Sequence, residues 1–365
     1  MSRVFSAGII AASLTVWGYT GDDLYSEFSE FSTQTSVAAG VGYTENVLLG
    51  EVVQLDSAFA YFGLEGVANK SFWGDQFTWS SLAYADVRTY DKLDGVPVHA
   101  IYLLQTELES YVGLISKGRV GARYLDLTQV FDATFDELER VDFIVEGSEP
   151  EFYVGYESML GEFEYDIELS AGHMAFKDMS NDYDSFSVEV EFERPLLDAL
   201  TWKSELEGWR RQYDEKSARS LSGIPLADTL LETEMVGAET GLRFTPIIFD
   251  TVNILELTAA YREREDLVTG YYDRSRLSAD IEWRTSAWGI DFDLSGTYTE
   301  YQYDHQFGDG GDLKASDSWY WELEMERKLS ESWSAFLNLS TEEESSNESF
   351  ASFETRTVLL GIRWR

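Results

Sequence analysis

Carboxylate side chains occur at every second position in several segments of this chain. The segment Glu162-Phe-Glu-Tyr-Asp-Ile-Glu-Leu169 places four carboxylates on one side and four apolar side chains on the other. Segments 185–193, 291–295 and 319–326 repeat this alternation. A period of two indicates β-strands with chemically opposite faces. Rows of carboxylates beside water concentrate cations and repel anions, so cation attraction is one chemistry that these residues suggest. The alternative is that they only solvate a polar interior and are partly neutralised by Arg on neighbouring strands.

The remaining reactive side chains do not indicate catalysis or metal binding. The chain has no Cys and only three His. Asp304 and His305 are adjacent, so in a strand their side chains point to opposite faces. The Asp-rich segments 178–182 and 304–312 offer the oxygen atoms that Ca²⁺ prefers, but their spacing matches no Ca²⁺-binding loop, and we interpret them as solvated loops. We therefore expect no enzyme activity, no metal site and no cofactor.

The charge balance is strongly acidic. Asp and Glu number 67 against 27 Lys and Arg, which gives a net charge of −40. Nucleic acid is excluded as a partner, because phosphate binding requires a basic patch. Aromatic residues make up 15% of the chain, and this content excludes a disordered chain.

Long strands that cross a bilayer explain the alternation better than a soluble sandwich, whose strands usually run about five or six residues. No stretch approaches the roughly 18 uncharged apolar residues of a membrane helix, and a chain that spans a bilayer without helices forms a closed barrel. We predict an all-β fold, a transmembrane antiparallel up-and-down β-barrel of about 16 strands. The strands are expected near residues 34–45, 56–68, 77–91, 99–113, 118–131, 150–160, 162–176, 183–194, 200–214, 231–245, 251–265, 272–284, 287–303, 316–329, 332–343 and 350–365.

Connections of two sizes alternate between these predicted strands. The short set comprises Leu114–Lys117, Gly161, Pro195–Ala199, Pro246–Phe249, Ser286 and Ser330–Glu331. The longer set comprises Asp132–Gly147, Glu215–Leu230 and His305–Ala315. Bacterial barrels have short periplasmic turns and long outer loops, so we expect both chain ends on the periplasmic side.

One domain, residues 34–365, accounts for the barrel, since no linker or low-complexity tract interrupts it. Residues 1–20 are interpreted as a signal peptide, with a positively charged start at Met1–Arg3 and an apolar core at Val4–Trp17. Residues 21–33 are then an N-terminal extension.

The alternation also separates lipid-facing from inward-facing residues. Leu277, Ile281 and Trp283 are expected to face lipid, and the polar residues between them are expected to face the lumen. The strands near 56–68, 77–91 and 118–131 do not alternate cleanly enough to assign. The residues expected to line the lumen are Glu164, Asp166, Glu168, Glu189, Glu191, Glu205, Glu207, Asp280, Glu282, Arg284, Glu322, Glu324 and Glu326.

The final strand resembles the terminal strand of Gram-negative outer-membrane β-barrel proteins, the porin-like superfamily, without pointing to one family. Val358, Leu360, Ile362 and Trp364 alternate with less apolar residues, although Arg365 follows the aromatic residue that usually ends the chain. The resemblance implies a place in the bacterial outer membrane. It also implies contact with outer-membrane lipid, recognition by the barrel assembly machinery during biogenesis, and a fold that can form a homo-oligomer.

Two functional hypotheses follow. The first is a porin-like diffusion channel with an acidic, cation-favouring lumen, in which the apolar content of Asp132–Gly147 suggests a constricting loop. The alternative is a closed structural or interaction barrel that serves as an anchor or as part of an envelope export or assembly complex.

Overall fold

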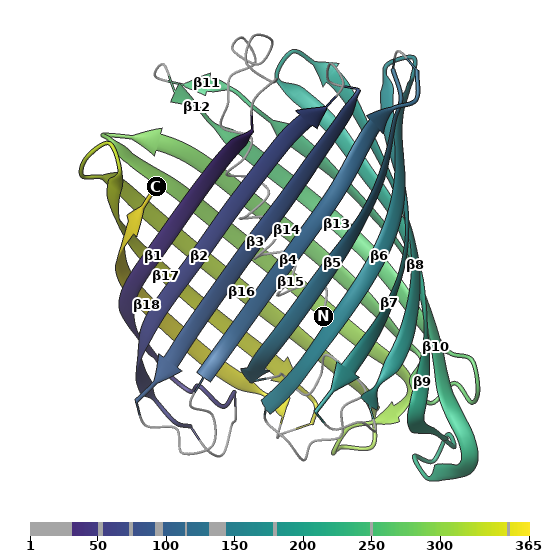
Figure 1. Ribbon diagram of the computed structural model, residues 1–365. Helices are drawn as coiled ribbons and strands as arrows, with labels where there is room; N and C mark the ends of the chain where they lie inside the picture. Colours follow the sequence, from purple (N-terminus) through teal and green to yellow (C-terminus); the bar gives the residue numbers. More distant parts are fainter. Residues whose placement is uncertain are drawn as a thin grey trace.

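The computed structural model describes residues 31–49, 54–72, 76–91, 98–113, 115–130, 144–177, 181–248, 251–348 and 351–365. These residues form a closed β-barrel (Figure 1). Within them, no helix is long and apolar enough to cross a membrane. The expected signal peptide at 1–20, nearly all of the expected extension at 21–33 and most of the expected constricting loop at 132–147 lie outside the described residues.

Sixteen antiparallel strands make up the barrel, and β1 pairs with β18 to close it. They are β1 (Ser32–Thr44), β2 (Ser57–Phe72), β3 (Phe77–Tyr90), β4 (Val98–Tyr111), β5 (Lys117–Val130), β6 (Ile144–Leu160), β7 (Phe163–Phe176), β8 (Tyr183–Leu197), β9 (Leu200–Arg219), β10 (Pro225–Phe244), β13 (Ile254–Asp266), β14 (Arg274–Ala287), β15 (Ile290–Phe307), β16 (Leu313–Lys328), β17 (Trp333–Ser346) and β18 (Phe353–Trp364). Between β10 and β13, β11 (Ile247–Ile248) and β12 (Thr251–Val252) form a separate small hairpin. The predicted up-and-down barrel of about 16 strands is confirmed.

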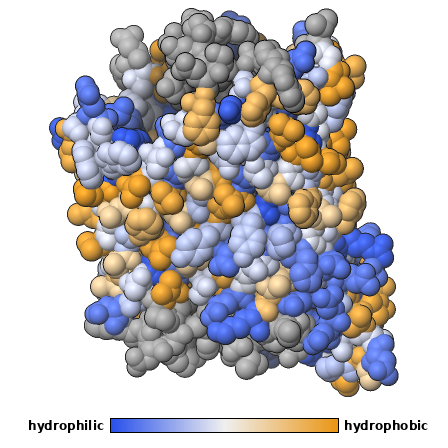
Figure 2. All heavy atoms as spheres, in the orientation of Figure 1, coloured by the Kyte–Doolittle hydropathy of each residue, from blue (hydrophilic) through white to orange (hydrophobic). Residues whose placement is uncertain are grey.

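The outer wall of the barrel is apolar, because alternate residues of the strands turn apolar side chains outward. On β14, Leu277 and Trp283 are exposed, whereas Ser278 is buried and Asp280 is half-buried. Figure 2 shows hydrophobic residues gathered on the outer wall, with hydrophilic residues predominating towards the projecting end of β9 and β10. An exposed apolar wall of this extent is suited to lipid and not to water.

The two ends of the barrel differ in their connections. At the upper end in Figure 1, Trp288 and Gly289 form the two-residue turn between β14 and β15, with φ of +55° and +72° as such hairpin turns require. The start of β1 and the end of β18 meet at this end, where Val37 pairs with Trp364. Outer-membrane barrels turn their short connections towards the periplasm, and the expectation that both chain ends lie on that side rests on this rule. We call the opposite end of the barrel the outer end.

At the opposite end, β9 and β10 continue past the rim as a two-stranded ribbon. This differs from the prediction, which has a loop over residues 215–230. Tyr213 is the last residue of β9 that pairs with β8, yet β9 continues to Arg219 and β10 begins at Pro225. The two strands pair with each other there, with register shifts between Pro225 and Glu232, so the backbone groups that face the partner strand can be satisfied without a further neighbour. In the same way β6 begins at Ile144, earlier than predicted, because it pairs with the end of β5.

Aromatic rings packed on glycines fill the inner side of the seam between β1 and β18. The ring of Phe59 lies so close to Gly42 that a Cβ at this position would stand 2.2 Å from the ring. Phe336 covers Gly361 in the same way, at 2.5 Å. Only glycine permits such an approach. The first and last strands are therefore joined by apolar packing as well as by hydrogen bonds.

Candidate functional site

The thirteen residues predicted to face inward share one face of the closed sheet. The register places Glu168 opposite Glu189, and Glu189 opposite Glu207. It is the inner face of the closed barrel, on which Arg119 of β5 reaches Asp166 of β7 across the intervening β6. The thirteen residues placed on it are Glu164, Asp166, Glu168, Glu189, Glu191, Glu205, Glu207, Asp280, Glu282, Arg284, Glu322, Glu324 and Glu326.

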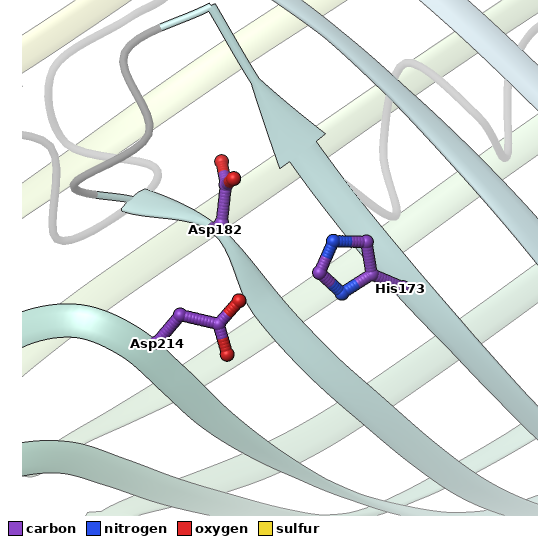
Figure 3. A group of neighbouring side chains, drawn as sticks. All are labelled: His173, Asp182 and Asp214. Atoms are coloured by element: carbon purple, nitrogen blue, oxygen red, sulfur yellow. The ribbon is translucent and has the colours of Figure 1, made fainter.

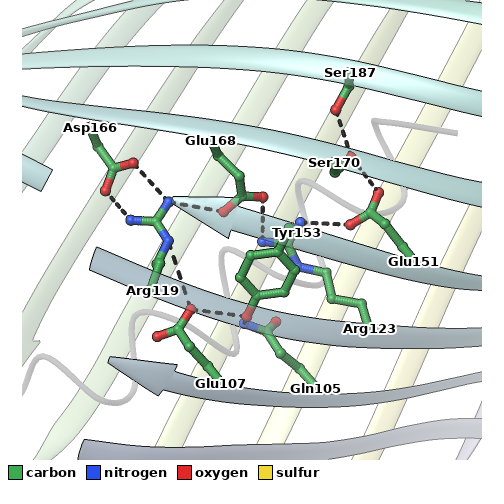
Figure 4. A network of polar contacts seen from close by, with 10 residues as sticks. All are labelled: Gln105, Glu107, Arg119, Arg123, Glu151, Tyr153, Asp166, Glu168, Ser170 and Ser187. Carbon is green, nitrogen blue, oxygen red and sulfur yellow. Dashed lines mark hydrogen bonds and ion pairs between the residues drawn. The ribbon is translucent and has the colours of Figure 1, made fainter. Parts of the chain in front are cut away.

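Arg119 is the centre of an ion-pair network on the inner wall formed by β4 to β8 (Figure 4). Its guanidinium donates to both carboxylate oxygens of Asp166, with Nη2 at 2.7 Å from Oδ1. The same Nη2 lies 2.9 Å from Oε2 of Glu168, and Nε lies 3.8 Å from Oε2 of Glu107. Bidentate guanidinium–carboxylate contacts are among the stronger charge-assisted hydrogen bonds. Arg119 thus pairs with carboxylates from two other strands.

Arg123 lies four residues further along β5, on the same face, and extends this network. Its Nη1 lies 3.0 Å from Oε1 of Glu151, and its Nη2 lies 2.8 Å from Oε1 of Glu168. The guanidinium also stacks over the ring of Tyr153, 4.2 Å from the centroid. Glu168 therefore accepts from both arginines, and the two guanidinium groups together contact four carboxylates, those of Glu107, Glu151, Asp166 and Glu168.

Tyr153 links the network to β4. Its ring is buried and covers Gly121, where a Cβ would stand 2.3 Å from the ring. Its hydroxyl donates to Oε2 of Glu107 at 2.9 Å and accepts from the amide of Gln105 at 2.9 Å. These contacts fix the network to the wall and leave little freedom for its side chains.

A second group of carboxylates, Glu189, Glu191 and Glu205, lies on the adjoining wall formed by β8 and β9. One carboxylate oxygen from each lies within 4.8 Å of the others. Within the described parts of the chain, no Lys or Arg forms an ion pair with any of the three. The nearest compensated neighbour is Glu207, which pairs with Arg262. We call these three residues the carboxylate cluster.

Basic residues compensate the acidic ones on the wall nearer the short turns. Glu256 accepts from Lys203 at 3.2 Å and from Arg243 at 2.9 Å. Arg284 pairs with Glu282 and, at 3.3 Å, with Asp293. This part of the inner face is close to neutral.

The three carboxylates on β16 are also largely engaged. Glu326 is almost completely buried and pairs with Arg363 and with Arg365, the latter at 2.7 Å. Arg363 lies 3.1 Å from Glu324 as well. Glu322 accepts a hydrogen bond from the Tyr320 hydroxyl at 2.6 Å.

Arginines stacked on aromatic rings occupy the inner wall towards the outer end of the barrel. Arg211 lies over Trp209, 4.2 Å from the ring centroid, and over Tyr183 at 4.7 Å. On the neighbouring wall Arg274 lies over Tyr301 at 5.3 Å. Such cation–π contacts hold the guanidinium groups flat against the wall.

An apolar cluster fills part of the inner face at the same end, and a connection between strands contributes to it. The cluster comprises Leu125, Leu127, Val145, Met174, Phe176, Tyr183, Tyr213, Leu231 and Tyr272. Tyr272 comes from the connection between β13 and β14, which folds back because Asp266 accepts from the backbone N–H of Val268 at 3.0 Å and donates its own N–H to Asp273 at 2.6 Å. Burial raises the pKa of the Asp273 carboxyl above its ordinary value. The ring of Tyr272 therefore packs inside the barrel, at its outer end.

Several of these residues escape a prediction from sequence. The strand that carries Arg119 and Arg123 does not alternate cleanly, because Gly118 and Gly121 interrupt the pattern. The sequence does contain one signal. Arg119 and Arg123 are an even number of residues apart and so share one face of their strand, as do Glu107 and Glu109 on the preceding strand. Nothing in the sequence indicates that Tyr272 packs inside the barrel.

Comparison with known proteins identifies the fold. No protein-family description and no curated protein matches the sequence. Among solved structures, Acinetobacter baumannii OccAB4 is 8% identical and aligns over 92% of this chain and 98% of its own, with a TM-score of 0.52. A. baumannii OccAB3 is 12% identical over 91% of this chain and 99% of its own, with a TM-score of 0.50. An anion-selective porin from Comamonas acidovorans is 12% identical over 92% and 99%, with a TM-score of 0.48. The first two likenesses extend over nearly the whole of both chains, so this chain shares the fold of bacterial outer-membrane porin barrels.

Proposed function

We propose that the protein is a porin-like diffusion channel of the outer membrane whose acidic lumen favours cations. The observation that carries the proposal is the carboxylate cluster of Glu189, Glu191 and Glu205 on the inner face. Its charges have no Lys or Arg partner among the described residues, whereas the carboxylates on either side of it are paired. In a water-filled barrel, unpaired carboxylates attract cations and repel anions.

The arginines at the outer end do not cancel this effect. Arg211 and Arg274 are held against Trp209, Tyr183 and Tyr301, and they lie nearer the mouth than the carboxylate cluster does. Salt screens charges separated by more than about 10 Å at 0.1 M. The electrostatic potential that acts on an ion beside the carboxylate cluster is thus determined mainly by the three carboxylates.

Planar-bilayer recordings test the channel directly. The purified chain should produce discrete conductance steps, and its zero-current potential in a KCl gradient should show that K⁺ permeates more readily than Cl⁻. An anion preference at low salt would reject the cation-favouring lumen, and a complete absence of conductance steps would reject the channel.

A closed structural or interaction barrel is the second candidate, as an anchor or as part of an envelope export or assembly complex. The apolar cluster that includes Tyr272 at the outer mouth favours it, since apolar side chains facing a lumen hinder the passage of ions. The same recordings separate the two candidates, because a closed barrel gives no steps.

Biogenesis is part of the proposal. Residues 1–20 would direct export as a signal peptide, and the alternating residues of β18 would be read by the barrel assembly machinery. The same wall could also support a homo-oligomer. Truncation of β18 before Val358 should abolish insertion into the outer membrane if that strand carries the assembly signal.

A further inference from the structure

A group of potential metal ligands lies outside the lumen, near the projecting end of the barrel. It combines His173 on β7, Asp182 directly before β8 and Asp214 on β9 (Figure 3). One ligand atom from each lies within 4.8 Å of the others. His173 is adjacent to Met174 in β7, so the two side chains point to opposite faces of the strand. Met174 packs inside the barrel, and the group that contains His173 therefore lies on the outer wall.

The imidazole of His173 is oriented by a further carboxylate. Its Nδ1 lies 2.9 Å from Oδ1 of Asp184, the residue paired with it in the register of β7 and β8. When Nδ1 carries the proton and donates to Asp184, Nε2 presents a lone pair. A histidine that binds a metal through one ring nitrogen commonly donates from the other to a carboxylate.

The two aspartates are anchored through the backbone and remain available as ligands. Oδ1 of Asp182 accepts from the N–H of Phe176 at 2.7 Å, and the Asp214 N–H donates to the Asp182 carbonyl at 2.9 Å. Within the described residues, neither carboxylate forms an ion pair with Lys or Arg. A cation bound between them would offset the repulsion between the two carboxylates.

We propose that His173, Asp182 and Asp214 bind a transition-metal dication such as Zn²⁺ at the outer surface. Imidazole together with carboxylate oxygen suits Zn²⁺ and its neighbours, whereas Ca²⁺ and Mg²⁺ prefer oxygen ligands alone. Three protein ligands leave a fourth tetrahedral position for water. Asp184 is a positioning residue that holds the imidazole.

The position of Asp214 gives the metal a structural consequence. Asp214 directly follows Tyr213, the last residue of β9 paired with β8, so it stands where the ribbon of β9 and β10 leaves the barrel. A metal held by Asp214, His173 and Asp182 joins the base of this ribbon to β7 and to the start of β8. Binding therefore restrains the ribbon.

Zn²⁺ binding to the folded chain in detergent, without a polyhistidine tag and after chelator treatment, tests the site. Isothermal titration with Zn²⁺ alone should show one ion per chain with micromolar or tighter affinity. His173→Gln should weaken binding by more than about 100-fold, and Asp184→Asn by about 10- to 100-fold. Hydrogen exchange should slow on Zn²⁺ addition in residues 214–219 and 225–232.

Two matched variants keep the outcome decisive. His305→Gln removes a histidine elsewhere and should leave Zn²⁺ binding unchanged, and Glu191→Gln alters the carboxylate cluster in the lumen with the same expectation. Binding that survives His173→Gln, or that is lost in Glu191→Gln, would overturn the site. An absence of Zn²⁺ binding to the unaltered folded chain would also overturn it.

Discussion

Two neighbouring stretches of the inner wall carry similar numbers of carboxylates but differ in what surrounds them. On β5 to β7, Asp166 and Glu168 are held by Arg119 and Arg123. On β8 and β9, the carboxylate cluster of Glu189, Glu191 and Glu205 has no such partners in the described chain. The difference shows that a count of acidic residues does not determine the charge that a permeating ion meets. The first stretch stabilises the wall, and we propose that the second attracts cations.

The largest effect is expected from removing the central arginine of the network. Arg119→Ala leaves Asp166, Glu168 and Glu107 partly uncompensated in a half-buried site, so the free energy of unfolding should fall by about 2–4 kcal/mol, between the values for exposed and buried pairs. Glu191→Gln, which relieves repulsion, should leave stability unchanged or raise it. Urea unfolding of the barrel in lipid measures both, and equal losses in the two variants would contradict the contrast between the two stretches.

Salt should remove most of the proposed cation preference. The Debye length falls from about 10 Å at 0.1 M to about 3 Å at 1 M, so charges on the wall no longer reach the middle of the lumen. The permeability ratio of K⁺ to Cl⁻ should therefore approach that of free solution at 1 M. A preference that persists unchanged at high salt would indicate a selectivity based on pore size or direct binding.

The carboxylates on β16 provide a comparison with a smaller expected effect. Glu324 and Glu326 are paired with Arg363, and Glu326 also with Arg365. Replacing Glu322, Glu324 and Glu326 with Gln should thus change the zero-current potential less than the same replacement in the carboxylate cluster. An equal or larger change would mean that these ion pairs do not screen their carboxylates.

The smallest effect concerns the outer mouth. Tyr272→Ala removes a ring from the apolar cluster, and single-channel conductance should rise modestly while the ion preference stays the same. Tyr271→Ala, which alters the adjacent ring, is the matched control and should change conductance less. A lower conductance in Tyr272→Ala would show that the ring supports an open mouth and does not narrow it.

The fold could be predicted from sequence because its main signal is local. Alternation along Leu277–Trp283 is visible within a few residues. The turns are placed less exactly, because the connection predicted at Ser286 lies at Trp288 and Gly289. The ribbon of β9 and β10 was predicted as a loop because polar residues that project into water show no apolar face. Its strands are defined by pairing with each other, which the sequence does not display.

The functional groupings could be predicted only in part, because they depend on register between strands. Alternation is enough to put Glu168 and Glu189 on one face, but it does not reveal that Arg119 reaches Glu168 while Glu189 has no such partner. The His173 group likewise combines residues from three chain segments, and its spacing in sequence matches no metal-binding motif. Local alternation identifies the face of the sheet on which a residue lies, whereas the pairing of the strands determines which carboxylates lie beside an arginine.

The zero-current potential of a variant that lacks the carboxylate cluster tests the central claim most directly. Unaltered protein and the triple variant Glu189→Gln, Glu191→Gln, Glu205→Gln should be recorded in planar bilayers across the same KCl gradient, with about 0.1 M on the dilute side, where screening is weak. We expect a cation preference for the unaltered protein and its loss or a large decrease in the triple variant, with conductance steps still present. Unchanged potentials in the two proteins, or an anion preference in the unaltered one, would contradict the account.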